Sequence, residues 1–394
     1  MFRKLSIRDV ELKGRRVLVR VDFNVPLDET NSVTDNTRIR ESLPTIRYIL
    51  QSGGSVVLMS HLGRPKGKRN EKYSLMPVAT ELSRLLARPV ALAPDCIDEV
   101  THRLSSELEP GGVLLLQNLR FHPGEEANDP VFAGALAANG DLFCNDAFGA
   151  SHRAHASVVG VAEHLTATMG FLVEKELAFF GKALSEPDPP FVAIVGGAKV
   201  SDKLPVLRNL VELVDSFIIG GGMCYTFLKA RGVEIGLSKV EPEQIEMAAE
   251  TLAMIEKKGK TVYLPIDHVI ADAFAPNANV RVVKGNIPDG WMGLDIGPET
   301  SSLFQAVARN AGTAVWNGPL GVFEMAPFAA GTRDMCAALA ECHGTTIIGG
   351  GDTAAAVANF GYADKMSHIS TGGGASLELL QGLVLPGVAA LRDK

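Results

Sequence analysis

Short apolar segments rich in Val, Ile and Leu recur along the chain and alternate with segments of helical periodicity. Such uninterrupted apolar runs are typical of strands that are covered on both faces, because neither face meets solvent. Helical segments between them, such as 74–87, complete the βαβ pattern of a parallel sheet. The predicted strands lie at 15–23, 55–63, 112–121, 142–149, 191–197, 216–222, 261–267, 313–321 and 345–352.

The pattern changes near residue 186 and divides the chain into two predicted lobes. Residues 171–185 have the periodicity and the residue types of a helix. The prolines that follow within 186–190 cannot continue that helix, and a new strand then begins. We therefore expect an α/β fold of two doubly wound, Rossmann-like lobes, each a parallel sheet covered by helices. The expected N-terminal domain is 1–170, followed by an interdomain helix and hinge at 171–185 and a C-terminal domain at 186–379.

Polar and basic side chains follow the predicted strands of the first half at the point where each strand ends. Ligands of open parallel sheets bind outside the carboxyl ends of the strands, so these side chains predict one crevice. One arginine after a strand is usually a surface charge, but repetition at successive strand ends favours a site for planar anionic groups. The residues expected to line it are Asp22, Asn24, His61, Arg64, Arg120 and Arg153, with Arg38 from the loop after the first strand.

Glycine-rich loops follow the predicted strands of the second half, at 196–197, 220–222, 349–351 and 372–374. Glycine lets the backbone approach a ligand closely, and the N-terminus of a following helix favours an anion. One such loop is weak evidence, but several in one domain predict a nucleotide or phosphate site. Asp352 follows one of them and is placed either to cap a helix or to hold Mg²⁺ on nucleotide phosphates.

Neither of two standard nucleotide motifs is complete. No segment fits the phosphate-binding loop G-x-x-x-x-G-K-[ST]. The dinucleotide fingerprint is nearly met by Gly349, Gly351 and Ala354, but the next predicted strand does not end in the acidic residue that would bind a ribose. An NAD-dependent dehydrogenase is therefore the weaker alternative, and a nucleotide-binding module without catalysis is a second one.

Composition narrows the class of protein further. The 394 residues include 38 basic and 45 acidic side chains, giving a net charge of -7. This balance argues against a protein that binds nucleic acid by neutralising phosphates. No apolar run reaches the length of a membrane helix, and residues 1–14 lack the apolar core of a signal peptide. The five cysteines form no C-x-x-C pair, so we expect reduced thiols and a cytoplasmic location.

The chain resembles the phosphoglycerate kinase family, bacterial type, in segments that occur in family order between residues 20 and 380. These segments are RVDFNVP, HLGRPKG, LRFHPGEE, NDAFGASHRAHAS, GGAKVSDK, IIGGGM, WNGPLGVFE, GGGDTA and STGGGASLELL. The resemblance implies a monomeric, hinge-bending phosphotransferase of glycolysis and gluconeogenesis with a carboxyl group as acceptor. It would transfer a phosphoryl group reversibly from 1,3-bisphosphoglycerate to ADP, giving 3-phosphoglycerate and ATP, with Mg²⁺. The small-molecule substrates would be its partners, with no nucleic acid or membrane.

The resemblance also implies which residues form each site. The phosphoglycerate ligands would be the same seven crevice residues. The tail, 380–394, would pack back on the N-terminal domain, and Gln381 departs from the acidic residue expected there. The nucleotide ligands would be Gly197, Lys199, Lys203, Asn317, Glu324, Gly350, Gly351, Asp352 and Thr353, with Asp352 also as the metal ligand.

The expected chemistry agrees with these residue types. Transfer from an acyl phosphate to a nucleotide needs no nucleophilic side chain, because both reacting groups are already oxygens. The protein must align the substrates, exclude water and neutralise the transferring group. Arg38 and Lys199 are the expected catalytic residues, one from each lobe, meeting when the lobes close. Helix N-termini at 350–353 and 372–374 would add backbone donors.

Overall fold

The structure, a computed structural model, describes residues 3–394. The chain divides into two compact units. Unit 1 contains residues up to 178 together with 384–394, and unit 2 contains residues 179–383. The division falls within helix α6, Phe171–Ser185, whose bounds agree with the helix predicted from the sequence.

Unit 1 is built on a six-stranded parallel sheet in the order β3-β4-β2-β1-β5-β6. Its strands are β1 (Arg16–Arg20), β2 (Ser55–Met59), β3 (Ala91–Leu92), β4 (Val113–Leu115), β5 (Leu142–Asn145) and β6 (Ala167–Met169). Its helices are α1 (Thr37–Gln51), α2 (Met76–Leu86), α3 (Glu99–Ser106), α4 (Pro123–Glu126), α5 (Pro130–Ala137) and α14 (Pro386–Ala389).

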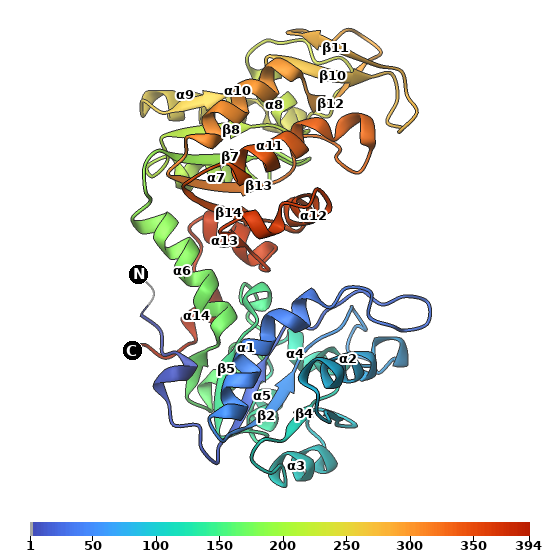
Figure 1. Cartoon of the computed structure of the whole chain (residues 1–394), viewed down its shortest axis with the longest axis vertical. Coiled ribbons are helices and arrows are strands. Elements are labelled where there is room, and N and C mark those ends of the chain that lie inside the picture. Colours follow the sequence, from blue (N-terminus) through green and yellow to red (C-terminus); the bar gives the residue numbers. More distant parts are fainter. Residues whose placement is uncertain (1–2) are drawn as a thin grey trace. The chain divides into compact units, whose positions relative to one another are not determined.

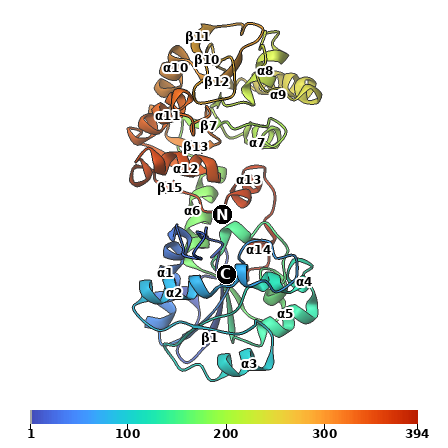
Figure 2. The same ribbon diagram turned by 90° about the vertical axis from the view of Figure 1, so that its right-hand side faces the viewer.

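Helices cover both faces of this sheet. In Figure 2, α1 and α2 lie on one side of β1 and α4 and α5 on the other. Alternate residues of each strand point to opposite faces, so Val17 and Val19 join the core with α1 and α2, while Leu18 between them faces the other layer. Because both faces of the sheet are buried, the strand sequences are continuous apolar runs rather than alternating apolar and polar residues.

Unit 2 has a second six-stranded parallel sheet, in the order β15-β14-β13-β7-β8-β9. Its strands are β7 (Phe191–Val195), β8 (Ser216–Ile219), β9 (Thr261–Tyr263), β13 (Thr313–Asn317), β14 (Thr345–Gly349) and β15 (His368–Ile369). Figure 2 shows α10, α11 and α12 on one side of it and α7, α8, α9 and α13 on the other. These helices are α7 (Leu204–Leu210), α8 (Cys224–Ala230), α9 (Ile245–Lys257), α10 (Pro298–Arg309), α11 (Ala330–Ala340), α12 (Gly351–Asn359) and α13 (Gly374–Leu380).

The expected α/β class with a parallel sheet in each half is therefore confirmed, with one addition (Figure 1). Residues 261–267 do not form one strand: β9 ends before Pro265, which has no N–H for a sheet hydrogen bond. Asp267 instead begins a separate antiparallel sheet. Its strands are β10 (Asp267–Ala271), β11 (Val280–Lys284) and β12 (Met292–Ile296).

Short 3-10 helices join several of these elements. They are η1 (Ile7–Asp9), η2 (Glu71–Tyr73), η3 (Leu119–Phe121), η4 (Phe148–Ala150), η5 (Gly160–Glu163), η6 (Pro242–Gln244), η7 (Ala326–Phe328) and η8 (Ala363–Lys365). Among residues 3–394, no helix has both the length and the apolar character needed to cross a membrane.

Candidate functional site

The carboxyl ends of neighbouring strands β4, β2, β1 and β5 meet at one edge of the unit 1 sheet. Arg20, the last residue of β1, pairs with Met59 of β2 and with Asn145 of β5. The strands β2, β1 and β5 therefore end at the same level. The loops that follow the four strands carry Asp22, Asn24, His61, Arg64, Arg120 and Arg153. The structure therefore brings the predicted crevice residues to one edge of one sheet.

Arg38 lies on the first turn of α1, so its predicted position in the preceding loop is wrong. The carboxylate Oδ1 of Asp35 accepts hydrogen bonds from the backbone N–H and the hydroxyl of Thr37, at 2.9 and 2.6 Å, and these contacts fix the start of the helix. The Nη1 of Arg38 donates to Oδ2 of Asp22 at 2.6 Å. This ion pair holds Arg38, whose side chain is 40% exposed, beside the end of β1.

Four hydrogen bonds fix the loop after β2. The backbone N–H of Gly63 donates to Oδ1 of Asn24 at 2.9 Å, and its carbonyl accepts from Nη1 of Arg120 at 2.8 Å. Buried Asn118 bonds both backbone groups of Leu62, its Nδ2 donating at 2.7 Å and its Oδ1 accepting at 3.2 Å. The loops after β1, β2 and β4 are thus tied to one another by their own polar groups.

Arg20 is a residue of this region that the sequence analysis missed. It is 1% exposed, and its guanidinium donates to Oγ of Ser157 at 2.8 Å, to the carbonyl of Val21, and to Nδ1 of His61 at 3.0 Å. The hydroxyl of Ser157 donates onward to Oε1 of the fully buried Glu125 at 2.6 Å. A basic residue at the end of an apolar strand, directly before the polar loop, is the signal that could have identified it.

This network sets the state of His61. Guanidinium groups only donate hydrogen bonds, so Nδ1 of His61 must accept and Nε2 must carry the proton. Burial holds the pKa of His61 well below its usual range, and the charges of nearby arginines lower that pKa further. These arginines are Arg20, Arg120, Arg153 and Arg38. His61 is therefore a neutral hydrogen-bond donor surrounded by positive charge.

Unit 2 has a cavity of about 410 Å³ at the carboxyl ends of its strands. Gly197, Glu324 and Asp352 are the predicted nucleotide residues that line it. The remaining wall includes apolar groups, which suit a flat base, and these are Leu237, Phe274, Met292, Leu294 and Val322. This combination of glycine loops, apolar wall and carboxylates fits a nucleotide.

Two glycine-containing loops beside this cavity touch through their backbones. Gly196 donates its N–H to the carbonyl of Asn317 at 3.0 Å, and Gly197 donates to the carbonyl of Pro319 at 2.9 Å. A Cβ on Gly318, where φ is +102°, would lie 2.2 Å from the Gly196 oxygen. Only glycine permits this approach, which packs the loops after β7 and β13 together.

Lys203 contacts Asn317 at the carboxyl end of β13. The ammonium of Lys203 donates to Oδ1 of Asn317. Burial lowers the pKa of Lys203, and the nearby carboxylates of Asp202 and Asp352 oppose that shift. Nδ2 of Asn317 is buried and has no hydrogen-bond partner within residues 3–394. This amide is available to a ligand oxygen.

Lys199 is exposed. The loop that follows it is fixed by the carboxylate of Glu241, which the sequence pattern does not identify. Oε2 of Glu241 accepts from the backbone N–H groups of Val200 and Ser201 at 2.6 and 3.0 Å. Its Oε1 accepts from the Ser201 hydroxyl at 2.9 Å. Glu241 thus positions the backbone that carries Lys199.

The start of α12 brings the last predicted residues together. Gly350 precedes the helix with a φ of +85°, and Gly351 and Asp352 are exposed on its first turn. The buried hydroxyl of Thr353 accepts from the Gly318 N–H at 2.7 Å, which locks the helix start against the loop after β13. Asp352 belongs to no cluster of three metal-ligating side chains in the described part of the chain.

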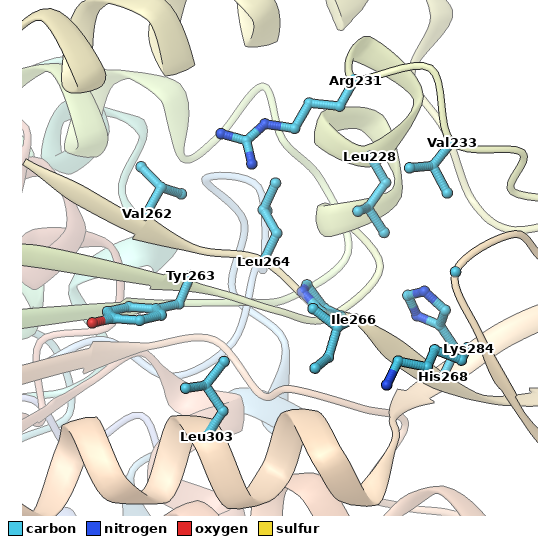
Figure 3. Close-up of a pocket in the computed structure, with 12 residues that line it drawn as sticks. Leu228, Arg231, Val233, Val262, Tyr263, Leu264, Ile266, His268, Lys284 and Leu303 are labelled. Atoms are coloured by element: carbon cyan, nitrogen blue, oxygen red, sulfur yellow. The ribbon is translucent and has the colours of Figure 1, made fainter.

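A second cavity of unit 2, about 510 Å³, contains none of the predicted residues (Figure 3). Most of its wall is apolar, including Leu228, Val262 and Leu303, with Arg231 and Lys284 also present. Both cations are already paired, with Glu256 and with Glu299. It is therefore not the candidate site.

Comparisons with known proteins agree with this geometry. Residues 7–383 match the family model described as phosphoglycerate kinase. The chain is 56% identical over 392 residues to a phosphoglycerate kinase of Moorella thermoacetica, covering 99% of this chain and 100% of that protein. It is 56% identical over 396 residues to one of Chloroflexus aggregans, covering 99% of each.

Solved structures show the same similarity. The phosphoglycerate kinase of Coxiella burnetii superposes with a TM-score of 0.90 at 39% identity, covering 98% of each chain. That of Pyrococcus horikoshii superposes with a TM-score of 0.85 at 30% identity, again covering 98% of each.

Proposed function

The chain belongs to the phosphoglycerate kinase family, whose reaction is the reversible transfer of a phosphoryl group from 1,3-bisphosphoglycerate to ADP, and we propose that unit 1 binds the phosphoglycerate and unit 2 the nucleotide. The observation that carries this assignment is the set of cationic side chains at the ends of neighbouring strands in unit 1. Unit 2 offers glycine loops and an apolar wall instead.

In unit 1, the phosphoglycerate supplies a phosphate and a carboxylate. Both groups accept bidentate hydrogen bonds, which is the geometry that arginine provides. We assign the binding to Arg38, Arg64, Arg120 and Arg153, with Asp22, Asn24 and His61 as further ligands. Neutral His61 donates a hydrogen bond from Nε2 and is not a general base, which its lowered pKa supports.

In unit 2, we assign the nucleotide phosphates to the loops at Gly197 and Gly350–Gly351, to Lys199 and Lys203, and to the start of α12 with Thr353. The buried, unpartnered Nδ2 of Asn317 supports a ligand oxygen at this point. Glu324 lines the cavity and is assigned to the nucleotide as well.

The residues present also fit a magnesium ion. Asp352 offers a hard carboxylate oxygen on the cavity wall, and Mg²⁺ usually takes one or two carboxylates and completes its shell with phosphates and water. Among the described residues Asp352 belongs to no group of three metal-ligating side chains, which agrees with that mode. When bound, the ion supplies positive charge for the nucleotide phosphates.

Catalysis in this proposal is electrostatic. The carboxylate oxygen of 3-phosphoglycerate and the β-phosphate oxygen of ADP are the two groups between which the phosphoryl group moves, so no side chain needs to form a covalent intermediate. Arg38 neutralises the transferring group from unit 1 and Lys199 from unit 2. Direct transfer requires the bound substrates to meet, which is the reason for expecting domain closure during turnover.

Calorimetry on two variants tests the assignment. Arg64→Ala is expected to weaken 3-phosphoglycerate binding and leave Mg·ADP binding unchanged, whereas Asp352→Asn is expected to do the reverse. The same effect of either variant on both ligands would contradict the assignment of one substrate to each unit. NAD serves as the control ligand, and its binding in place of Mg·ADP would favour the dehydrogenase alternative. If the protein binds 3-phosphoglycerate and ATP but does not turn them over, the alternative of a nucleotide-binding module without catalysis would be favoured.

We also propose that the protein acts as a monomer in the cytoplasm. The cysteines are free, and Cys96, Cys144, Cys224 and Cys336 are buried, which suits a reducing compartment.

A further inference from the structure

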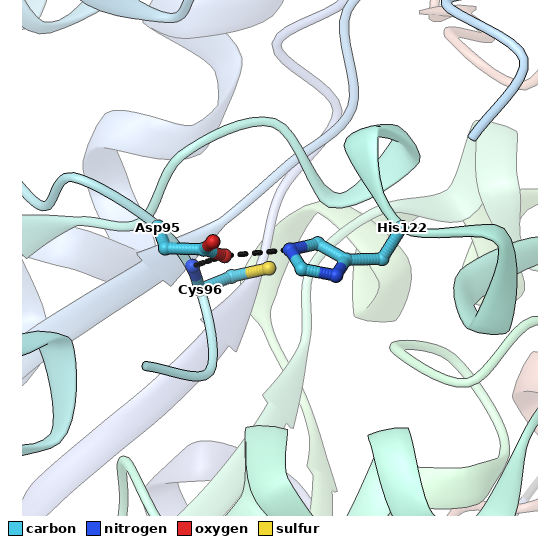
Figure 4. A group of neighbouring side chains, drawn as sticks. All are labelled: Asp95, Cys96 and His122. Atoms are coloured by element: carbon cyan, nitrogen blue, oxygen red, sulfur yellow. Dashed lines mark hydrogen bonds and ion pairs between the residues drawn. The ribbon is translucent and has the colours of Figure 1, made fainter. Parts of the chain in front are cut away.

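Asp95, Cys96 and His122 form a cluster in unit 1 that the proposed phosphoglycerate site does not use. One ligand atom from each residue lies within 4.8 Å of the other two. Oδ1 of Asp95 lies 2.6 Å from Nε2 of His122. Figure 4 shows the carboxylate and the thiol sulfur on the same side of the imidazole ring.

The backbone holds these side chains in place. The carbonyl of Asp95 accepts from the Gln117 N–H at 3.2 Å and from the Thr101 hydroxyl at 3.1 Å. The carbonyl of Cys96 accepts from Nδ2 of the fully buried Asn139 at 3.0 Å. The His122 ring packs against Phe132, with ring centroids 5.2 Å apart. These contacts fix the backbone of Asp95 and Cys96 and the ring of His122, so only a small side-chain movement is needed to admit a ligand.

The three side chains of the cluster differ in their exposure to solvent. Cys96 is 0% exposed, whereas the side chains of Asp95 and His122 are 31% and 26% exposed. A metal ion could enter from the exposed side, and a water molecule could occupy a fourth coordination position there. Three protein ligands and one water complete a tetrahedron.

We propose that Asp95, Cys96 and His122 bind a zinc ion through Oδ1, Sγ and Nε2. A mixed set of sulfur, nitrogen and oxygen ligands suits Zn²⁺, while Mg²⁺ and Ca²⁺ prefer oxygen alone. Binding forms a Zn–S bond and a Zn–N bond. The S–H bond breaks and releases its proton to the buffer, while the Nε2 proton that His122 shares with Asp95 is exchanged through solvent to Nδ1, so that Nε2 presents a free lone pair to the ion. The thiolate and the carboxylate then balance the charge of the ion. Tetrahedral ligand atoms lie about 3.3–3.7 Å apart at usual zinc distances, so the Asp95–His122 contact must widen by about 0.7–1 Å.

The ion would link two separate segments of unit 1. Asp95 and Cys96 lie between β3 and α3, and His122 directly precedes α4. A ligand that binds only the folded state stabilises it, so zinc should raise the resistance of these segments to unfolding.

Cobalt titration of the full-length protein tests the site. The protein is stripped with a chelator, kept reduced with a phosphine and titrated with Co²⁺, whose thiolate charge-transfer band reports a cobalt–sulfur bond. We expect one equivalent of Co²⁺ to produce this band together with tetrahedral visible bands, and Zn²⁺ to displace both. Cobalt bound by carboxylates and phosphates elsewhere gives no thiolate band.

Three variants identify the ligands. Cys96→Ser should abolish the charge-transfer band, and His122→Gln should weaken cobalt affinity at least about tenfold. Cys342→Ser is the matched control, because this thiol lies outside the cluster, and it should keep the wild-type titration. The inference is overturned if wild-type protein gives no thiolate band, if the band persists in Cys96→Ser, or if His122→Gln binds as tightly as wild type. His122→Gln carries the test by itself if Cys96→Ser fails to fold.

Discussion

Arg20 stabilises unit 1 from within its core, since it contacts His61, Ser157 and, through Ser157, Glu125. The pKa of the Glu125 carboxyl lies below its usual value. Burial alone would raise this pKa, but the hydrogen bond with His155, the charge of Arg20 and the hydrogen bonds from Ser157 together lower it by more. The buried carboxylate thus depends on the arginine.

Replacing Arg20 by Met should therefore destabilise unit 1. The variant leaves a buried carboxylate without its compensating charge, and the expected loss in the free energy of unfolding is about 3–5 kcal/mol. Urea unfolding followed by circular dichroism measures it, with the exposed neighbour Arg15→Met as the control. Equal stability of the two variants would mean that Arg20 is dispensable to the core.

Asp295 on β12 gives unit 2 a defined pH dependence. Burial raises the pKa of this carboxyl to about 7, against hydrogen bonds from the Gly331 and Ile296 N–H groups that lower it. In the unfolded chain it ionises near its ordinary value of 3.8. Between these two values the folded state binds more protons, so the contribution to stability is present at low pH and is lost as pH rises toward 7.

Asp295→Asn should remove this component of the pH dependence. Both tryptophans, Trp291 and Trp316, belong to unit 2, so their fluorescence during urea unfolding reports this unit. The stability of wild type relative to the variant should fall as pH rises from 3.8 to about 7 and should level off above that. Parallel pH profiles would argue against a raised pKa at this position.

At the scale of elements, the start of α12 depends on Gly350. A side chain at a φ of +85° is strained, and the expected cost of Gly350→Ala in folding free energy is about 1–3 kcal/mol. A Cβ there would also lie 3.4 Å from the Asn317 amide, at the proposed phosphate position. Gly350→Ala should therefore weaken Mg·ADP binding as well as stability.

Gly361→Ala is the matched control. Its φ is +78°, and a Cβ there has no neighbour within 4 Å. It should lower the unfolding midpoint of unit 2 as Gly350→Ala does, while calorimetry finds normal Mg·ADP affinity. Equal Mg·ADP affinity in Gly350→Ala and Gly361→Ala would contradict the assignment of the start of α12 to the nucleotide site.

Elements with strong local signals could be predicted from sequence. Helix α6 agrees with its predicted bounds because good helix formers are followed directly by prolines. The antiparallel sheet was missed because β11 is largely exposed and lacks an apolar run. The sequence pattern predicts a loop at Arg38 because the start of α1 depends on the contact between Asp35 and Thr37, which has no apolar signal.

The candidate site was predictable to the extent that parallel strands bring their carboxyl ends together. That rule placed the polar loops of unit 1 side by side. It could not identify Arg20 or Glu241, whose roles arise from contacts with distant segments, with Ser157 in one case and with Val200 and Ser201 in the other. Long-range packing of this kind leaves no local pattern in the sequence.

At the scale of the whole molecule, unit 1 includes the end of the chain. Residues Leu385, Val388 and Leu391 of the tail are buried, and Gly387 donates its N–H to the Ser151 carbonyl at 2.8 Å. The sequence predicts that the tail returning to the N-terminal domain begins at residue 380. In the structure, the part of the tail that belongs to unit 1 begins at Val384.

Deleting residues 384–394 should destabilise unit 1 selectively. Each buried apolar side chain contributes about 1.5–3 kcal/mol, so the loss amounts to several kcal/mol. Hydrogen exchange should increase throughout unit 1, while the tryptophan unfolding transition of unit 2 stays near that of wild type. Destabilisation of unit 2 alone would contradict the assignment of the tail.

The central claim is that phosphoryl transfer depends on positive charge supplied by the end of the unit 1 sheet, and Arg38 tests it most directly. The measurement is steady-state turnover of 3-phosphoglycerate and ATP by Arg38→Ala, with the exposed neighbour Arg40→Ala as the control. Donors directed at transition-state charge contribute ~10²–10³ in rate, so kcat of Arg38→Ala should fall by about that factor while Mg·ATP affinity is unchanged. Arg38→Lys should recover part of the loss, because it keeps the charge without the planar guanidinium. A kcat for Arg38→Ala within about threefold of wild type would contradict the account, since it falls far short of such a contribution.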